Sequence, residues 1–417
     1  MGPDAVRRSM DRCTKCGICQ AYCPVAAVTD RFPGPKYTGP QAQRFRVIEQ
    51  TKDVSFALCS GCGICTSVCP NGVAITDIIT IARAESIESD AGLPLRQRLL
   101  NRPDTIGRIA GAAPAMANAV LGNRALRALV HAVIGVHRDA PLPRVAGRMF
   151  RRWLSKHEQP NGPIVSYFSG CAVEHYDPDV GIAAVRVLNR LGFRVDAPTD
   201  ACCALPMLSS GEWRAARRRA AAIIHGLSPA AEAGRTIVST STSCSLTLRS
   251  KYAAYLDMND EPARQVADAV VDICEFLRNG HMGRLAEILK PLAGHVIYHG
   301  PCQLRGHGMG LPAVELLRLV PELSVELCKA DCCGVAGTYG YDGDKHEIAV
   351  AVGRTLFDRV EEAKPDLIVC DSETCRWNIE RVTGVPCRHP IEVLAASILG
   401  DRNLAGLSNE GFEDRSY

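Results

Sequence analysis

The sequence predicts a multidomain α+β protein in which a small helical, cysteine-rich domain precedes two tandem α/β lobes. Two observations support this prediction. Eight cysteines form two closely spaced runs near the N-terminus, and a second set of cysteines occurs twice later in the chain, each time among alternating strand-like and helix-like segments. A chain of 417 residues is also long enough to form two or three hydrophobic cores.

The two N-terminal runs share the spacing C-x2-C-x2-C-x3-C-P. Bacterial two-cluster ferredoxins use this spacing to hold two [4Fe–4S] clusters, and the fourth cysteine of each run binds the other cluster. We therefore expect cluster 1 to be bound by Cys13, Cys16, Cys19 and Cys69, and cluster 2 by Cys59, Cys62, Cys65 and Cys23. Structural zinc sites would need four ligands each, usually in two separated pairs, and explain the pattern less well.

Residues 1–100 should form this two-cluster, ferredoxin-type domain. Proline and glycine hold the spacer from Phe32 to Pro40 extended, which brings the second run beside the first. After the second run, apolar residues at positions 75, 78, 79 and 82 have a helical period. This helix should pack beneath the clusters.

Composition restricts the class of protein. The net charge of +3 is almost balanced, which argues against nucleic acid as a partner. Twenty cysteines in a chain of this size, many in cluster spacing, indicate reduced thiols on the cytoplasmic side rather than disulfides. We expect no secretory signal in residues 1–12. We also expect no membrane-spanning helix, because the longest apolar stretch, Ile109 to Gly122, is too short.

Residues 101–160 are expected to form an amphipathic, basic, helical linker. Apolar residues at positions 126, 129, 130, 133 and 134 form one helical stripe, and a second helix is expected around 145–156 with arginine and lysine opposite its apolar side. Such a basic helix is typical of a membrane interface or a partner-docking surface. The alternative is that these helices cap the neighbouring domains, and the sequence leaves both interpretations open.

Residues 161–290 and 291–400 form an internal duplication. The cysteines of the first copy are Cys171, Cys202, Cys203 and Cys244, and they recur as Cys302, Cys332, Cys333 and Cys375 at offsets of 131, 130, 130 and 131. In each copy, apolar strands alternate with helical segments, so the cysteines should collect at the carboxyl ends of parallel strands. The polar tail, residues 401–417, is predicted to be disordered.

This cysteine pattern resembles the CCG cysteine-rich domain of heterodisulfide reductase and related iron–sulfur proteins. The resemblance implies CCG-type lobes and an additional [4Fe–4S] cluster at the second tetrad, with the first tetrad as the weaker candidate. Ser241 and Ser372 stand where that family often has another cysteine, and a hydroxyl is a poorer iron ligand than a thiolate. Cys370 could supply a substitute thiol. The alternative is a degenerate fold with buried free thiols.

Two further sets of residues lie near these cysteines. The glycines Gly334, Gly337 and Gly340 follow a cysteine pair rather than a first strand, so they predict a loop around the site and not a nucleotide-binding motif. Three histidines could tune a redox site or carry protons, although packed histidines are more common. They are His175, His299 and His307.

The order of these parts resembles the C-subunit family of anaerobic glycerol-3-phosphate dehydrogenase over nearly the whole chain. The resemblance includes Pro33 to Lys36, Phe150 to Trp153, Cys332 to Gly340, Glu373 to Trp377, and His389 to Ile391. It implies an iron–sulfur electron-transfer protein of anaerobic respiration, without catalytic residues of its own. Such a protein accepts electrons from an FAD-containing dehydrogenase partner and passes them toward quinone, on the cytoplasmic side and peripheral to the inner membrane.

Three alternatives remain open from the sequence. The chain could serve a 2-hydroxyacid oxidase that acts on glycolate or lactate, or it could reduce a disulfide at its own cluster, as heterodisulfide reductase does. The third alternative is a zinc-stabilised interaction scaffold. The serines at 241 and 372 argue against disulfide reduction, because that chemistry in the related family uses additional thiolates.

Overall fold

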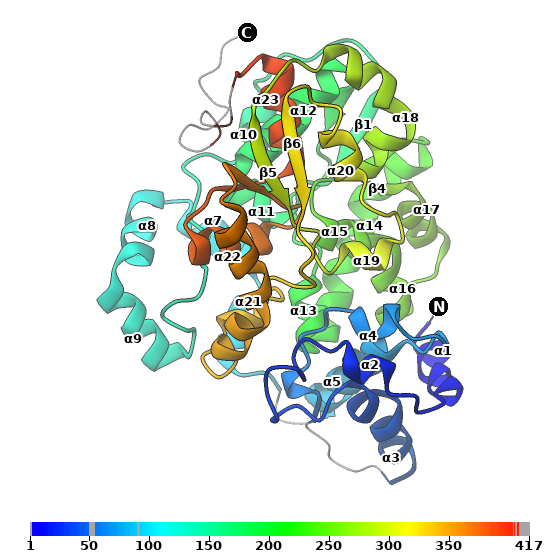
Figure 1. Ribbon diagram of the computed structural model, residues 1–417. Coiled ribbons are helices and arrows are strands. Elements are labelled where there is room, and N and C mark those ends of the chain that lie inside the picture. Colours follow the sequence, from blue (N-terminus) through cyan, green and yellow to red (C-terminus); the bar gives the residue numbers. More distant parts are fainter. Residues whose placement is uncertain (1, 50–54, 90–91, 403, 405–406, 408–417) are drawn as a thin grey trace.

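A computed structural model describes residues 2–49, 55–89, 92–402, 404 and 407 (Figure 1). A small helical unit at the N-terminus lies against a larger body that contains two β-sheets. A helical linker runs between them in the sequence, and its helices α8 and α9 stand at the side of the body (Figure 1). The structure is thus rich in helix with two small parallel sheets, in agreement with the predicted α+β class.

The N-terminal unit consists of short helices around the cysteine runs. They are α1 (Pro3–Arg8), η1 (Ser9–Arg12), α2 (Ile18–Ala21), η2 (Tyr37–Gln41), α3 (Ala42–Glu49), η3 (Ser55–Leu58), α4 (Ile64–Ser67) and α5 (Ile75–Ser89). Helices α2 and α4 each begin directly after a glycine in the left-handed region, Gly17 and Gly63. Helix α5 buries Ile75, Ile78 and Ile79 beneath both cysteine runs, as its helical period predicted.

The linker contains helices α6 (Leu95–Leu100), α7 (Pro103–Ala110), α8 (Pro114–Gly122), α9 (Arg124–Ile134) and α10 (Phe150–Leu154). Helix α9 contains all five residues of the predicted stripe, but the second predicted helix is reduced to α10. Phe150 is fully buried and its ring packs edge-on against Tyr167, with 5.4 Å between the centroids. Trp153 also packs against the core of the first repeat. This helix therefore caps the first repeat, because its apolar side chains find partners there.

The two repeats contain two parallel sheets of identical topology. The first sheet has the order β2-β1-β3-β4 and the second β6-β5-β7-β8, so each strand of one repeat has a counterpart in the other. The strands are β1 (Ile164–Tyr167), β2 (Arg194–Asp196), β3 (Ile237–Ser239), β4 (Val270–Asp272), β5 (Gly294–Tyr298), β6 (Leu323–Leu327), β7 (Leu367–Val369) and β8 (Cys387–Arg388). This common order agrees with an internal duplication.

Helices connect the strands of each repeat. In the first repeat they are α11 (Gly170–His175), α12 (Pro178–Arg190), α13 (Leu205–Ser210), α14 (Trp213–Glu232), α15 (Thr242–Leu246), η4 (Thr247–Lys251), α16 (Tyr252–Leu256), α17 (Glu261–Ala269) and α18 (Ile273–Ile288). In the second repeat they are α19 (Leu304–His307), α20 (Pro312–Leu317), η5 (Tyr339–Tyr341), α21 (His346–Ala363), α22 (Glu373–Thr383) and α23 (Pro390–Leu399).

The two repeats pack against each other through a shared hydrophobic cluster, and each also has a further buried cluster. Val165 and Tyr167 of the first sheet belong to the same buried cluster as Val296 and Tyr298 of the second. Helix α12 packs against α23 across the boundary between the repeats. The two repeats therefore form one body, because buried side chains and helices of both repeats contact each other.

Two further expectations concern the tail and the membrane. Leu404 and Leu407 are buried against the second repeat, so the predicted disorder does not hold at these two positions. The positions 403, 405, 406 and 408–417 lie outside the described residues. In the part of the chain that the structure describes, no helix combines the length and the apolar character needed to cross a bilayer.

Candidate iron–sulfur sites and the cavity between them

The structure brings together the four cysteines expected to bind cluster 1. Cys13, Cys16, Cys19 and Cys69 line one small hollow together with Lys36 and Pro70. Burial raises the pKa of Cys19, and the charges on the other three cysteines raise it further. The backbone N–H of Val73 donates to Cys69 Sγ at 3.4 Å. Four sulfurs that repel one another as thiolates form a donor set that an iron–sulfur cluster would neutralise.

The second N-terminal set also assembles as expected. Burial raises the pKa of Cys62 to about 12, with further increases from the charges on Cys332, Cys59 and Cys23. Cys65 is buried, and its Sγ lies 3.1 Å from Thr76 Oγ1 at the start of α5. The fourth cysteine of the first run therefore lies with the first three of the second run. The contribution of Cys332 shows that this set also borders the second repeat.

In the second repeat, the four expected cysteines converge from three loops. Cys302 follows β5, Cys332 and Cys333 precede η5, and Cys375 lies in the first turn of α22. Hydrogen bonds from Cys302 and Cys333 lower the pKa of Cys332, and hydrogen bonds from Cys333 and Cys370 lower the pKa of Cys375. All five sulfurs are buried. Cys370 is thus a fifth sulfur beside this tetrad.

The backbone around the second tetrad has one strict requirement. The N–H of Gly334 donates to Cys332 Sγ at 3.3 Å, and Gly334 has a φ of +87°. A Cβ at this position would lie 1.9 Å from the carbonyl oxygen of Ala349 in α21. Only glycine fits here, because the loop passes directly against the helix backbone. Of the three glycines predicted to shape a loop at this site, Gly334 therefore has that role.

The first repeat has a similar tetrad with two differences. Cys244 Sγ lies 3.2 Å from Cys203 Sγ, and hydrogen bonds link Cys203 to Cys202 and Cys202 to Cys171. Ser241 is the N-cap of α15, and its Oγ accepts from the N–H of Cys244 at 3.3 Å. The Ser241 hydroxyl therefore caps helix α15. The position equivalent to Gly334 is Ala204, which is held in the left-handed region at φ +62°.

Both tetrads open into one cavity of about 710 Å³, which the sequence did not predict. Residues of the linker helices α6 to α9 line it together with these cysteines. Side chains of Tyr176, Tyr341, Glu373 and Trp377 also line it. Most of the lining is apolar. Of the predicted apolar stripe of α9, Val130 and Ile134 line the cavity, whereas Leu126, Leu129 and Val133 are exposed.

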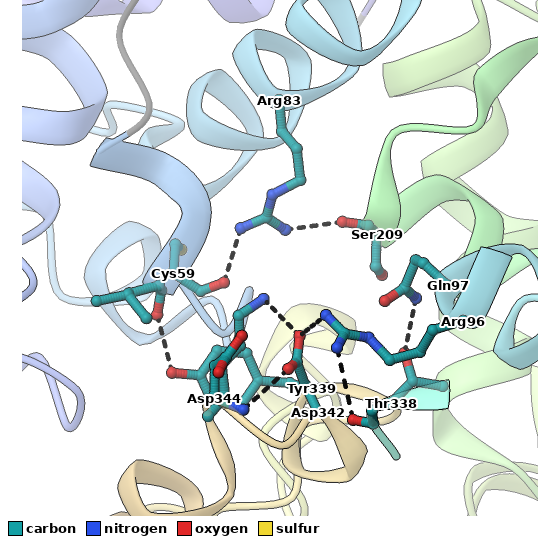
Figure 2. Close-up of polar contacts among 12 residues, drawn as sticks. Cys59, Arg83, Arg96, Gln97, Ser209, Thr338, Tyr339, Asp342 and Asp344 are labelled. Carbon is teal, nitrogen blue, oxygen red and sulfur yellow. Dashed lines mark hydrogen bonds and ion pairs between the residues drawn. The ribbon is translucent and has the colours of Figure 1, made fainter. Parts of the chain in front are cut away.

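A polar network fixes the N-terminal unit against this site (Figure 2). The guanidinium of Arg83 in α5 donates to the carbonyl oxygens of Cys59 at 2.8 Å, Ser209 at 2.7 Å and Phe56 at 2.6 Å. From the second repeat, Tyr339 Oη donates to the carbonyl oxygen of Leu58 at 3.1 Å. The Arg83 bonds link the second cysteine run to α13 of the first repeat, and the Tyr339 bond links it to the loop that follows Cys332 and Cys333.

The linker joins the same network. Arg96 of α6 forms an ion pair with the nearly buried Asp342 at 3.0 Å, and Gln97 donates to Thr338 Oγ1 at 3.3 Å (Figure 2). Lys345 approaches the same carboxylate at 3.5 Å. The N-terminal unit, the linker and the second repeat thus meet beside the cavity.

The three candidate histidines differ in their surroundings. His299 and His175 are buried, and neither ring has a hydrogen-bond partner among the residues that the structure describes. Burial lowers the pKa of His299, and the charges on Cys375 and Cys332 oppose that decrease. His307 is bonded to Ser245 and to the carbonyl oxygen of Thr242. Of the three histidines, His299 is therefore the best candidate to influence the redox potential of the second tetrad.

Comparisons with known proteins agree with these sites. A 4Fe-4S dicluster domain matches residues 9–73, and a cysteine-rich domain matches residues 165–249 and 296–380. The chain is similar to the C subunit of anaerobic glycerol-3-phosphate dehydrogenase from Escherichia coli K12, with 34% identity over 94% of this chain and 99% of the relative.

Two other relatives are more distant. "Glycolate oxidase iron-sulfur subunit" of Escherichia coli K12 is 27% identical over 93% of each chain. "Lactate utilization protein A" of Bacillus licheniformis is 28% identical over 57% of this chain and 99% of the relative. With the matched domains, these relatives show that [4Fe–4S] clusters are cofactors of this chain, as the cysteine spacing predicted.

Proposed function

Because the chain belongs to the C-subunit family of anaerobic glycerol-3-phosphate dehydrogenase, we propose that it is the iron–sulfur electron-transfer subunit of a membrane-associated dehydrogenase of that kind. The relatives show the coarser role, an iron–sulfur subunit of flavin-dependent dehydrogenases. In the proposal, substrate is oxidised on an FAD-containing partner. The acceptor is a quinone, which takes two electrons from the partner's substrate and two protons from water.

One observation carries the proposal: the cysteine sets lie in series and end at an apolar cavity. The charge on Cys332 contributes to the raised pKa of Cys62, and the charge on Cys62 to that of Cys302. The N-terminal unit therefore adjoins the second tetrad directly. That tetrad lines the same cavity as the first. The series thus leads from the first cysteine run to a space that suits an apolar acceptor.

The residues proposed to hold clusters are the sets described above. Cluster 1 is assigned to Cys13, Cys16, Cys19 and Cys69, and cluster 2 to Cys23, Cys59, Cys62 and Cys65. A third cluster is assigned to Cys302, Cys332, Cys333 and Cys375, and the first tetrad is a weaker candidate for a fourth. A bound [4Fe–4S] cluster supplies a one-electron redox site whose potential depends on hydrogen bonds to its sulfurs and on burial.

The chain's own residues determine where such sites lie and how they are tuned. Arg83 links the second cysteine run to Ser209 of the first repeat, and Tyr339 links it to the second repeat. The N–H of Gly334 donates to Cys332 Sγ, and such bonds stabilise negative charge on sulfur. The apolar walls of the cavity exclude water from the end of the series. We place the complex on the cytoplasmic side, peripheral to the inner membrane.

A second candidate keeps the electron-transfer role but changes the partner. The iron–sulfur subunit of glycolate oxidase matches 93% of this chain, so a flavoprotein that oxidises glycolate or lactate is the alternative. Disulfide reduction in the first repeat is less well supported, because the Ser241 hydroxyl caps α15.

The test uses the chain purified anaerobically with its flavoprotein partner. We expect glycerol 3-phosphate to reduce the clusters, as detected by EPR, while glycolate and lactate do not. Reduction by glycolate or lactate instead would replace the proposed substrate. If dithionite reduces the clusters but no substrate does so through the flavoprotein, the electron-transfer role itself is wrong.

A further inference from the structure

The segment formed by η4 and α16 lies where the first repeat meets the N-terminal unit. Tyr252 Oη donates to the carbonyl oxygen of Cys203 at 2.9 Å, so the segment is fixed to the first tetrad. Tyr255 Oη donates to Asp77 Oδ1 in α5 at 2.6 Å. Helix α16 also packs against α1 and α5 (Figure 1). One short segment therefore holds the N-terminal unit beside the first tetrad.

Lys251, the last residue of η4, connects this segment to the second tetrad. Its Nζ donates to Gln303 Oε1 at 2.7 Å, and Gln303 directly follows Cys302 in the sequence. Gln303 lines the cavity together with Cys302 and Cys203. The ammonium group of Lys251 is therefore attached to the second tetrad by a hydrogen bond, while the residue after it is attached to the first.

This ammonium group lacks an ordinary counter-ion. Among the residues that the structure describes, Lys251 forms no ion pair with a carboxylate, and its hydrogen-bond partner is the neutral amide of Gln303. Burial lowers the pKa of Lys251, and the charges on Asp77 and on two tetrad cysteines, Cys302 and Cys203, oppose that decrease. A cation withdrawn from water without a counter-ion costs stability. The fold alone therefore gains little from this charge.

The internal duplication shows that this contact is not symmetric. At the offset of 131 residues, Lys251 corresponds to Val382 in α22, whose side chain is 44% exposed. Gln303 corresponds to Ala172 at the same offset. Neither Val382 nor Ala172 has a charged or hydrogen-bonding side chain. The second repeat therefore offers the first tetrad no equivalent of the contact between Lys251 and Gln303, and the two tetrads differ in their electrostatic surroundings.

We propose that Lys251 tunes electron transfer at the second tetrad, because its positive charge raises the reduction potential of a cluster held there. A reduced [4Fe–4S] cluster carries one more negative charge than the oxidised form, so a nearby cation stabilises the reduced form. A higher potential at this tetrad favours electron flow to it from the N-terminal clusters. Gln303 is the positioning residue, since its amide oxygen holds the ammonium group in place. The inference rests on the proposed function, which assigns a cluster to this tetrad.

The test is a potentiometric titration of the full-length, cluster-loaded protein, followed by EPR. The signal of the second-tetrad cluster is the one that Cys332→Ser, Cys333→Ser removes. In Lys251→Met this cluster should titrate at a lower potential, so that its ratio of reduced to oxidised form at a fixed potential falls about tenfold. One unit charge at roughly 10 Å, with an effective dielectric constant of about 20, has an effect of this order.

Three further variants separate charge from shape. Lys251→Gln, a second neutral variant, should shift the potential in the same direction as Lys251→Met. Lys251→Arg keeps the charge and should retain most of the wild-type potential. The matched control, Lys156→Met, removes an exposed lysine of the linker and should titrate as wild type does.

Stability distinguishes this role from a structural one. Because the ammonium group has no counter-ion, Lys251→Met should unfold at the same urea concentration as wild type or at a higher one. A variant that unfolds more easily but keeps the wild-type potential would make Lys251 a structural residue and overturn the proposal.

The potentials decide the remaining outcomes. Equal potentials of Lys251→Met and wild type overturn the proposal, and so does an equal decrease in Lys251→Arg and Lys251→Met, which would attribute the shift to shape. If Cys332→Ser, Cys333→Ser removes no signal, the cluster assignment of the proposed function is wrong and the role of Lys251 is wrong with it. A cluster that is present but unaffected by Lys251→Met contradicts the role of Lys251 alone.

Discussion

Cys62 of the N-terminal unit lies so close to Cys332 of the second repeat that a charge on Cys332 raises the pKa of Cys62. The two residues belong to different cysteine sets and are far apart in the sequence. Arg83 and Tyr339 bond the second cysteine run to the body. The second N-terminal cysteine set therefore lies next to the second tetrad.

The second tetrad should hold a cluster of its own. We expect Cys332→Ser, Cys333→Ser to lose about four irons per chain, because a [4Fe–4S] cluster needs these thiolates. Iron and acid-labile sulfide analysis of anaerobically purified protein, together with EPR, measures the loss. The EPR signals of the two N-terminal clusters should persist. An unchanged iron content would show that these thiols bind no cluster, and Cys202→Ser, Cys203→Ser applies the same test to the first repeat.

Arg83 should stabilise the contact between the N-terminal unit and the body. Arg83→Met removes hydrogen bonds to three carbonyl oxygens, so we expect the free energy of unfolding to fall by about 2–3 kcal/mol. Urea unfolding followed by circular dichroism measures this change. Arg214→Met is the control, because Arg214 is exposed and its guanidinium lies 4.0 Å from Glu88, at the distance limit of an ion pair. Equal stability of the two variants would contradict the role given to Arg83.

The equivalent positions 204 and 334 should respond differently to exchange of alanine and glycine. Gly334→Ala should destabilise the fold by about 3 kcal/mol or more, because its Cβ would collide with the carbonyl oxygen of Ala349. Ala204→Gly should change stability by less than about 1 kcal/mol. Relief of the left-handed conformation is worth about 1–2 kcal/mol, but the lost buried methyl group and the more flexible unfolded chain offset it.

Thermal unfolding of both variants, with iron content measured in parallel, checks this pair. A large change in stability in Ala204→Gly, or a small loss in Gly334→Ala, would contradict the backbone constraints described for the two loops.

Buried carboxyl groups should give an unusual dependence of stability on pH. Burial raises the pKa of Glu174 from its ordinary value of 4.5 to about 7. The folded state thus holds this proton more tightly than the unfolded state, so the stability it contributes is complete below about pH 4.5 and is lost as the pH rises to about 7. Glu174→Gln should reduce this decline in urea titrations at several pH values.

Glu261 provides the opposite case. Its pKa is lowered by hydrogen bonds from Arg264 and Gln265 and by the charge of Arg264, so its contribution is lost when the pH falls. Glu261→Gln should therefore leave the decline between pH 4.5 and 7 unchanged. A Glu174→Gln variant with the wild-type pH profile would contradict the burial effect.

Local spacing and period were sufficient for much of the site. The first three cysteines of each run are grouped by their short spacing, and the exchange of Cys69 and Cys23 between the sets was predicted from the arrangement in two-cluster ferredoxins. Helix α5 and helix α9 followed from the period of their apolar residues. The constant offset between the two sets of later cysteines predicted the duplication, which the identical strand orders show.

Tertiary packing decided the rest, because contacts between distant segments leave no local period in a sequence. Tyr167 and Tyr298 belong to one buried cluster, although their strands lie in different sheets. The apolar stripe of α9 follows from the sequence. Whether its side chains face solvent or the cavity that the cysteines line depends on how α8 and α9 pack against the body. The sequence by itself determined which cysteines can form sets, through the spacing within each run and the constant offset between the two repeats. Only the tertiary structure decided that Cys62 adjoins Cys332 and that both tetrads face one cavity, because long-range packing brings these loops together.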